Sequence, residues 1–358
     1  MKTWKANWEE SKRRYIDWWN HKGVLLTMWE HFQDPAMAPH GERLAPAPAI
    51  DHQQRCLDPQ WRAAYIDWYM AHSSFLADIP PVANTELGPG SLAAILGCPL
   101  EGGADTIWIH QPDHFDPSAP IKFDRGSAGW QLHHRLLTEC KLRSNGNYYV
   151  GMPDLMEGLD VLASLEGTDN ALMNTMMDPE GTLQRLQEIN DVYFQVFDEL
   201  YEIIKEDDGM AFCYFSLWGP GKVSKLQSDI STMISEDDFR TFVQPFIREQ
   251  ARRLDLTLYH LDGVGAMRHL PALLEIEELD AIQWTPGVGE PQGGNPKWYD
   301  LYKQIIAGGK SIEANWVELD EIAPLLDAVG TEGIQINCDF HTEEEVRRAE
   351  DIIDRFIH

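Results

Sequence analysis

The sequence is poor in cysteine and has no long apolar run. Its cysteines show no CxxC spacing, which is typical of reduced thiols and not of a disulfide framework; they are Cys56, Cys98, Cys140, Cys213 and Cys338. No apolar run approaches the ~20 residues needed to span a bilayer, and the charged start, from Met1 to Lys5, is unlike a signal peptide. We therefore expect a cytoplasmic protein.

Positive charge is also scarce. Lys and Arg together number 29 against 58 Asp and Glu, which gives a net charge of −29. Such a surface repels phosphate backbones and anionic lipids, so we expect neither nucleic-acid nor membrane partners. A phosphate-binding loop is missing as well, because the glycines of GVGEPQGG (287–294) have neither GxGxxG spacing nor a helix start.

Eight short β-rich segments run along the chain, nearly all separated by helical segments. They lie at 24–29, 79–85, 148–152, 210–217, 256–259, 281–284, 311–316 and 333–338. Such alternation predicts a parallel sheet, and eight units predict a closed (β/α)8 TIM barrel. An open doubly wound sheet is the alternative. We expect a single domain over residues 1–358, with an N-terminal helix at 5–22 and rim excursions at 33–58 and 97–128.

The stretch LDLTLYHLDG (254–263) carries the clearest functional signal. His260 and Asp262 follow a β-rich run and precede Gly263. Because the side-chain period of a strand is two, both groups point to the same side. This arrangement predicts that both residues lie at the edge of a functional site. The alternative is a core histidine that is hydrogen-bonded to a neighbouring carboxylate.

Other strands end in polar or aromatic residues in the same way. Barrel active sites form at the carboxyl ends of the strands, so we expect these residues to line one site. The candidates are Glu30, His31, Glu86, Asp154, Trp218, His260, Asp262, Gln283, Trp284, Glu313, Asn315, Trp316, Asn337, Cys338 and Asp339. Among these we assign catalysis to Asp154, His260, Asp262 and Glu313, and we assign substrate binding to Glu30, His31, Glu86, Trp218, Gln283, Trp284, Asn315 and Trp316.

Three chemistries fit these residues. His260, Asp262 and Cys338 could hold zinc with an open fourth position. Alternatively, Asp154 could pair with Glu313 or Asp262 as acid and base. In that case three tryptophans would serve as sugar platforms, namely Trp218, Trp284 and Trp316. The third possibility is a decarboxylation that uses no metal.

Two stretches resemble the uroporphyrinogen decarboxylase superfamily, which includes zinc-dependent methyltransferases that act with corrinoid proteins. They are FSLWGPGKVSKLQSDISTMISEDDFRTFVQPFIREQ (215–250) and LYHLDGVGAMRHLPALLEIEELDAIQWTPG (258–287). The opening RRYIDWWN (13–20) resembles an uncharacterised, decarboxylase-like branch of the same group. The resemblance implies a (β/α)8 barrel with its site at the mouth.

The resemblance also bears on the chemistry. The superfamily's methyltransferases carry His-x-Cys-Gly on strand five and a further cysteine after strand eight. Here His260 and Gly263 match, Asp262 stands in place of the first thiol, and Cys338 is near the second. The arginine motif of true uroporphyrinogen decarboxylases has no counterpart at 28–32, which argues against tetrapyrrole decarboxylation.

We therefore expect an enzyme that acts on a small molecule, with zinc-dependent methyl transfer and a corrinoid protein as possible partner. The alternatives are a carboxylate-based glycoside hydrolase or lyase, and a non-catalytic binding protein. The strand ends offer acceptors and aromatic faces but almost no Lys or Arg; the nearest cations are Lys222, Lys225 and Arg268. For that reason we expect a neutral or cationic substrate.

Overall fold

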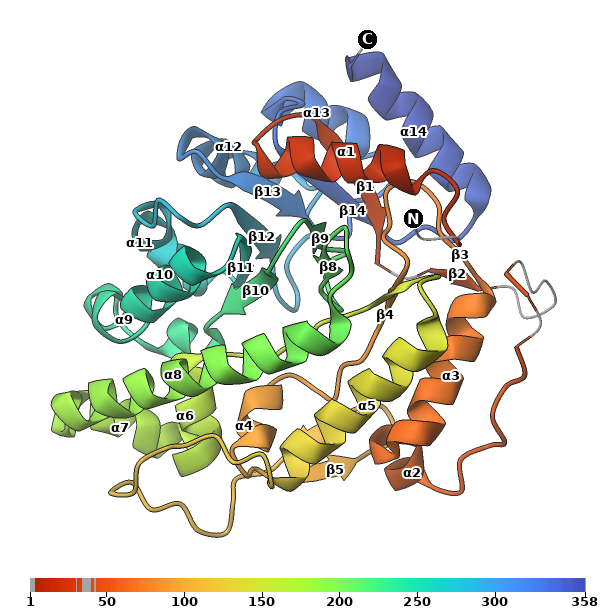
Figure 1. Cartoon of the computed structure of the whole chain (residues 1–358). Coiled ribbons are helices and arrows are strands. Elements are labelled where there is room, and N and C mark those ends of the chain that lie inside the picture. Colours follow the sequence, from red (N-terminus) through yellow and green to blue (C-terminus); the bar gives the residue numbers. More distant parts are fainter. Residues whose placement is uncertain (1–3, 30, 34–39, 42, 358) are drawn as a thin grey trace.

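A parallel sheet of six strands forms the centre of the molecule (Figure 1). The computed structural model describes residues 4–29, 31–33, 40–41 and 43–357. The strand order is β1-β14-β13-β12-β11-β10, and every neighbouring pair is parallel. The strands are β1 (Val24–Met28), β10 (Val223–Gln227), β11 (Leu256–Asp262), β12 (Ala281–Thr285), β13 (Ser311–Ala314) and β14 (Ile334–Cys338). The expected parallel sheet is confirmed, and its carboxyl ends meet at one edge.

Short strands continue from both edges of this sheet. These short strands are β4 (Val82–Ala83), β7 (Tyr149–Val150), β8 (Met210–Ala211) and β9 (Trp218–Gly219). The backbone nitrogen of Asp78, just before β4, donates to Leu26 of β1 over 2.8 Å. The strands β4 and β7 are parallel, and a parallel bridge from Met152 to Phe212 links β7 to the end of β8. At the other edge, the backbone nitrogen of Val223 contacts Met210 Sδ at 3.3 Å.

The predicted fourth strand at 210–217 begins at Met210 as expected but is much shorter than predicted. The strand β8 ends at Ala211 and pairs antiparallel with β9, and positive φ angles at Phe215 (58°) and Ser216 (49°) break the extended chain between them. The parallel neighbour of β11 is instead β10, where the sequence pattern predicts no strand. The pattern fails there because Lys225 and Gln227 face a polar interior, so that a buried strand lacks an apolar run.

Helices surround the strands and connect most of them (Figure 1). They are α1 (Trp8–Trp19), α2 (His52–Leu57), α3 (Pro59–Ala71), α4 (Ser91–Ile95), α5 (Ala128–Ser144), α6 (Gly158–Glu166), α7 (Thr168–Met177), α8 (Pro179–Ile204), α9 (Glu236–Phe242), α10 (Gln244–Arg253), α11 (Leu270–Leu274), α12 (Tyr299–Ala307), α13 (Ile322–Val329) and α14 (Glu343–Ile357), with 3-10 turns η1 (Asp229–Met233), η2 (Ala266–His269) and η3 (Pro296–Trp298). Ser235 caps α9, where its Oγ accepts from the nitrogen of Asp238 over 3.1 Å. No helix in the described part of the chain is long and apolar enough to cross a membrane.

The first helix belongs to the core. The side chains of Trp8 and Trp18 on α1 are fully buried. The indole nitrogen of Trp18 donates to the carbonyl of Ile312 on β13 (3.2 Å), and that of Trp19 donates to the carbonyl of Trp218 on β9 (2.9 Å). The predicted N-terminal helix is confirmed, and its aromatic side chains pack against the strands.

The two expected excursions pack against each other. The first contains α2, and the second contains an antiparallel hairpin of β5 (Leu100–Gly102) and β6 (Ile107–Ile109). The nitrogen of Gly102 donates to Gln53 Oε1 over 3.0 Å, and Arg55 donates to the carbonyl of Gly103 over 2.7 Å. A further antiparallel pair joins β2 (Phe32–Gln33), which follows β1 in the chain, to β3 (Ser73–Ser74), which follows α3.

Candidate functional site

A row of polar side chains crosses the inner face of the six-stranded sheet. Paired positions on parallel strands point to the same side of a sheet, and the register aligns five polar residues on five neighbouring strands. These are Gln227 on β10, His260 on β11, Gln283 on β12, Glu313 on β13 and Gln335 on β14. All but His260 are fully or almost fully buried. Burying polar side chains in a core costs folding free energy, because these groups lose their hydrogen bonds to water. A buried polar row therefore indicates that the interior of the sheet serves a function.

Several polar atoms in this interior lack a hydrogen-bond partner among the described residues. The amide of Asn337 donates to Glu313 Oε1 over 3.2 Å, but Glu313 Oε2 and Asn337 Oδ1 have no partner. The amide of Gln335 donates to Thr27 Oγ1 over 3.1 Å, while its own oxygen has none. Burial raises the pKa of Glu313 well above its ordinary value.

Three ligand-type side chains converge at the carboxyl end of β11. One ligand atom from each of Asp229, His260 and Asp262 lies within 4.8 Å of the others. His260 and Asp262 come from β11 itself, and Asp229 begins the η1 turn after β10. The carboxylate of Asp160 accepts from the nitrogens of Asp229 (3.1 Å) and Ile230 (2.9 Å), which anchors this turn.

The protonation of His260 suits a metal ligand. Burial and the charge of Lys225 lower the pKa of His260, so the imidazole is neutral near pH 7. Its Nδ1 is hydrogen-bonded to Gln283 Oε1, which accepts the Nδ1 proton and leaves the Nε2 lone pair for a metal. Gln283 is itself oriented by Thr285, since its amide nitrogen donates to Thr285 Oγ1 over 2.9 Å. Two carboxylates and one neutral imidazole form a donor set that fits zinc with an open position.

The structure does not bring Cys338 to this group. Asn337 points into the interior toward Glu313, so the next residue on β14 points to the opposite side. Burial raises the pKa of the Cys338 thiol well above its ordinary value. The negative charges of Glu318, Glu321 and Asp339 raise it further. Asp229 takes the third place in the cluster instead.

A buried ion pair lies next to the cluster. The ammonium of Lys225 on β10 is 2.5 Å from Asp154 Oδ2, and it also donates to Gln227 Oε1. The backbone nitrogen of Asp154 donates to Glu86 Oε2 over 2.8 Å, and the thiol of Cys213 donates to the same oxygen over 3.3 Å. Burial and the charge of Asp154 raise the pKa of Glu86 to about 8. Asp154 is therefore held by a lysine, and Glu86 is the protonated member of this pair of carboxyls.

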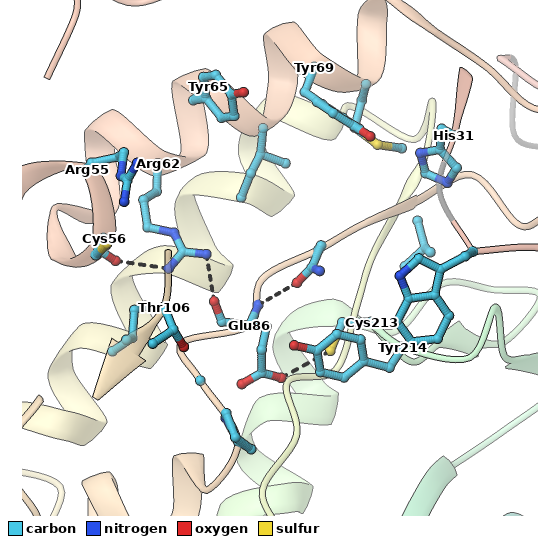
Figure 2. Close-up of a pocket in the computed structure, with 18 of the residues that line it drawn as sticks. His31, Arg55, Cys56, Arg62, Tyr65, Tyr69, Glu86, Thr106, Cys213 and Tyr214 are labelled. Atoms are coloured by element: carbon cyan, nitrogen blue, oxygen red, sulfur yellow. Dashed lines mark hydrogen bonds between the residues drawn. The ribbon is translucent and has the colours of Figure 1, made fainter. Parts of the chain in front are cut away.

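A cavity of about 650 Å3 opens beside these groups. Figure 2 shows His31, Glu86, Cys213 and Tyr214 on its wall, so two of the predicted binding residues, His31 and Glu86, do line it. Phe215 connects the cavity to the cluster, because its ring lies 5.1 Å from the ring of His260. The predicted residue Glu30 lies outside the described residues.

The sequence predicts almost no Lys or Arg at the strand ends, but the cavity beside those ends has cations that come from other elements. Arg55 and Arg62, from α2 and α3, line the cavity, and Lys225 lies in the interior. Sequence reasoning missed both arginines because they come from the excursion and the helix after it, far from any strand end. The argument for a neutral or cationic substrate loses its premise.

Two of the three predicted tryptophan platforms are core residues. Trp284 follows the inward Gln283 and therefore faces outward, where its ring packs 5.0 Å from Trp298. Trp218 packs 5.5 Å from Trp8 of α1. The predicted Trp316 is partly exposed and its ring lies 5.3 Å from that of Trp29, which lines the cavity.

Asn315 is buried, and its Oδ1 accepts from the backbone nitrogen of Trp316 over 3.1 Å. Sequence reasoning missed Asp229, and it named Lys225 only as a nearby cation, because it missed β10. The one available signal was the alternation of Lys225, Gln227 and Asp229, whose spacing of two places them on one side of an extended chain.

The comparisons with known proteins rest on structure. Neither a protein-family model nor a curated protein matches the chain. The solved structures that match include a methyltransferase from Methanosarcina mazei, with a TM-score of 0.61 and 13% sequence identity. The match covers 97% of this chain and 99% of that chain. It shows the fold. At this identity it carries no assignment of residues or substrate.

Proposed function

We propose that this protein is a metal-dependent methyltransferase that acts on a small molecule at the carboxyl end of the sheet. The observation that carries the proposal is the convergence of Asp229, His260 and Asp262 within 4.8 Å beside a cavity. The methyltransferase fold and the sequence resemblance agree with it. We also propose that the short strands β4, β7 and β8 close the sheet into a TIM-like α/β barrel in a single domain, with both excursions on its rim.

The residues of the chain would divide the work as follows. Asp229, Asp262 and His260 Nε2 would hold zinc, with Gln283 fixing the imidazole. Zinc bound there would lower the pKa of a heteroatom nucleophile and so prepare it to accept a methyl group. Glu86, which is protonated at neutral pH and lines the cavity, can supply a proton to a leaving group. A corrinoid protein is the partner that the resemblance implies.

A carboxylate-based hydrolase or lyase has less support. Two of its three sugar platforms, Trp218 and Trp284, are buried in the core. Of its paired carboxyls, Asp154 is bound to Lys225, and Glu313 is buried, which raises its pKa well above the ordinary value. The convergence of two carboxylates and a neutral histidine fits metal binding better.

Metal analysis of the purified protein tests the proposal. We expect the wild type to contain about one equivalent of zinc per chain. The variants His260→Ala and Asp229→Asn should lose this zinc. His110→Ala is the matched control, because His110 pairs with Glu101 over 2.8 Å on the exposed hairpin. Equal metal content in His260→Ala and wild type would contradict the proposal, as would less than about 0.1 equivalents in a zinc-saturated wild type.

A further inference from the structure

Two arginines on the cavity wall have no carboxylate partner among the residues that the structure describes. Arg62 donates to the carbonyls of Cys56 (2.9 Å) and Glu86 (2.6 Å), and Arg55 donates to those of Gly103 (2.7 Å) and Ala104. Among the described residues, no Asp or Glu oxygen lies within the 4.0 Å ion-pair distance of either guanidinium. Each guanidinium has five N–H donors and uses two of them on neutral carbonyls, so both keep donors and a full charge.

Both arginines are anchored on one contact between the excursions. Cys56 Sγ lies 3.8 Å from the carbonyl oxygen of Gly103, which also accepts from Arg55. Arg62 binds the carbonyl of the same Cys56. Figure 2 shows both guanidinium groups beside Cys56 at one end of the cavity. Two planar forks held in this way form a fixed site for an oxyanion.

The rest of the lining does not cancel this charge. Burial raises the pKa of Glu86 to about 8 and lowers that of His31 to about 4, so both are neutral at pH 7. Asp105 is then the charged carboxylate among the described lining residues, against two arginines. A positive wall on a chain with a net charge of −29 is a local reversal, and it favours an anion at that end.

Part of the remaining wall is formed by aromatic side chains. Trp61 and Tyr65 on α3 stack with their centroids 5.3 Å apart and their planes at 8°. Tyr69, Tyr214 and Phe215 extend this surface toward His260. Such faces bind planar apolar groups by stacking.

We propose that the cavity binds a ring-bearing small molecule with a carboxylate or phosphoryl group, which Arg55 and Arg62 hold at the end distant from His260. The proposal rests on the proposed function only in taking this cavity as the substrate site. The aromatic faces contact the ring, and the arginines set which end of the molecule approaches Asp229, His260 and Asp262. The two arginines are thus specificity-determining residues.

Calorimetric titration of the full chain with three probes tests this proposal. We expect naphthoate and naphthyl phosphate to bind. Naphthamide has the ring without the charge, and it should bind at least about tenfold more weakly. Whichever anion binds more tightly identifies the natural head group as carboxylate or phosphoryl. Arg55→Met and Arg62→Lys should weaken anion binding about tenfold and leave naphthamide unchanged.

Arg268→Met is the matched control, because Arg268 also donates to two carbonyls, those of Gly265 (2.7 Å) and Thr232 (3.2 Å), outside the cavity lining. Naphthamide binding as tightly as both anions, no saturable binding of any probe, or equal weakening in Arg268→Met would overturn the proposal. His260→Ala should keep anion binding. A failure of metal binding alone would therefore leave this result intact, and the two proposals can fail separately.

Discussion

Gln283 on β12 accepts the Nδ1 proton of His260 on β11, at paired positions of neighbouring strands. This bond decides which ring nitrogen is available to a metal. Gln283 is buried and is held in turn by Thr285, so the orientation of the imidazole is set by the sheet and not by a loop. A site carried by strands holds its geometry better than one on flexible segments.

Replacing Gln283 should weaken metal binding without removing a ligand. We expect Gln283→Leu to bind zinc 10- to 100-fold more weakly, by the usual effect of outer-shell partners, because the imidazole loses its fixed tautomer. Competition with a chelator measures this affinity. Gln250→Leu is the control: Gln250 is equally buried and donates to Asn190 on α8 over 3.0 Å, far from the cluster. An equal loss in both variants would assign the effect to general destabilisation.

The pair of Lys225 and Asp154 should behave as a buried ion pair. Both side chains are at least 95% buried, with 1% and 5% of their surface exposed. Lys225→Met leaves a buried carboxylate without its partner, and we expect it to lower the free energy of unfolding by about 3–5 kcal/mol. The double variant with Asp154→Asn should recover part of this loss. Urea denaturation gives the four free energies, and additive effects would show that the two residues are not coupled.

Glu86 should make stability depend on pH. Its pKa is raised from 4.5 to about 8, so between these values the folded state holds a proton that the unfolded chain releases. The contribution of Glu86 to stability is therefore complete below pH 4.5 and falls as pH rises toward 8, by up to about 1.4 kcal/mol per pH unit.

Glu86→Gln keeps the neutral shape and cannot titrate, so the difference in free energy of unfolding between wild type and this variant should change across that pH range. Denaturation series at several pH values measure it. Glu101→Gln, on the exposed β5, serves as control and should follow wild type. Parallel curves for wild type and Glu86→Gln would show that Glu86 titrates normally.

Two tryptophans should separate stability from binding. Trp284 is fully buried against Trp298, and we expect Trp284→Ala to cost about 3–5 kcal/mol of unfolding free energy. Trp284→Phe should refold and bind the naphthoate probe like wild type. Trp29→Ala removes an aromatic wall of the cavity and should weaken that binding at a smaller cost in stability. Weakened binding in Trp284→Phe would place that ring in the site after all.

The positions of five of the six strands in the sheet and one face of β11 could be predicted from local patterns. The apolar runs at β1, β12, β13 and β14 and the breaks after them are local signals, and His260 and Asp262 share a face because of the strand period alone. The sequence did not predict the strand β10, because a strand whose inner face is polar lacks the apolar pattern from which strands are recognised.

The sequence by itself determined the alternation of β and α elements and the pairing of His260 with Asp262, because both follow from short-range periodicity. Only the tertiary structure decided the third member of the cluster, the outward direction of Cys338, Trp218 and Trp284, and the arginines on the cavity wall. Those outcomes depend on register between strands and on packing between segments distant in the chain. No local pattern encodes such contacts, since Asp229 reaches His260 only through the pairing of β10 with β11.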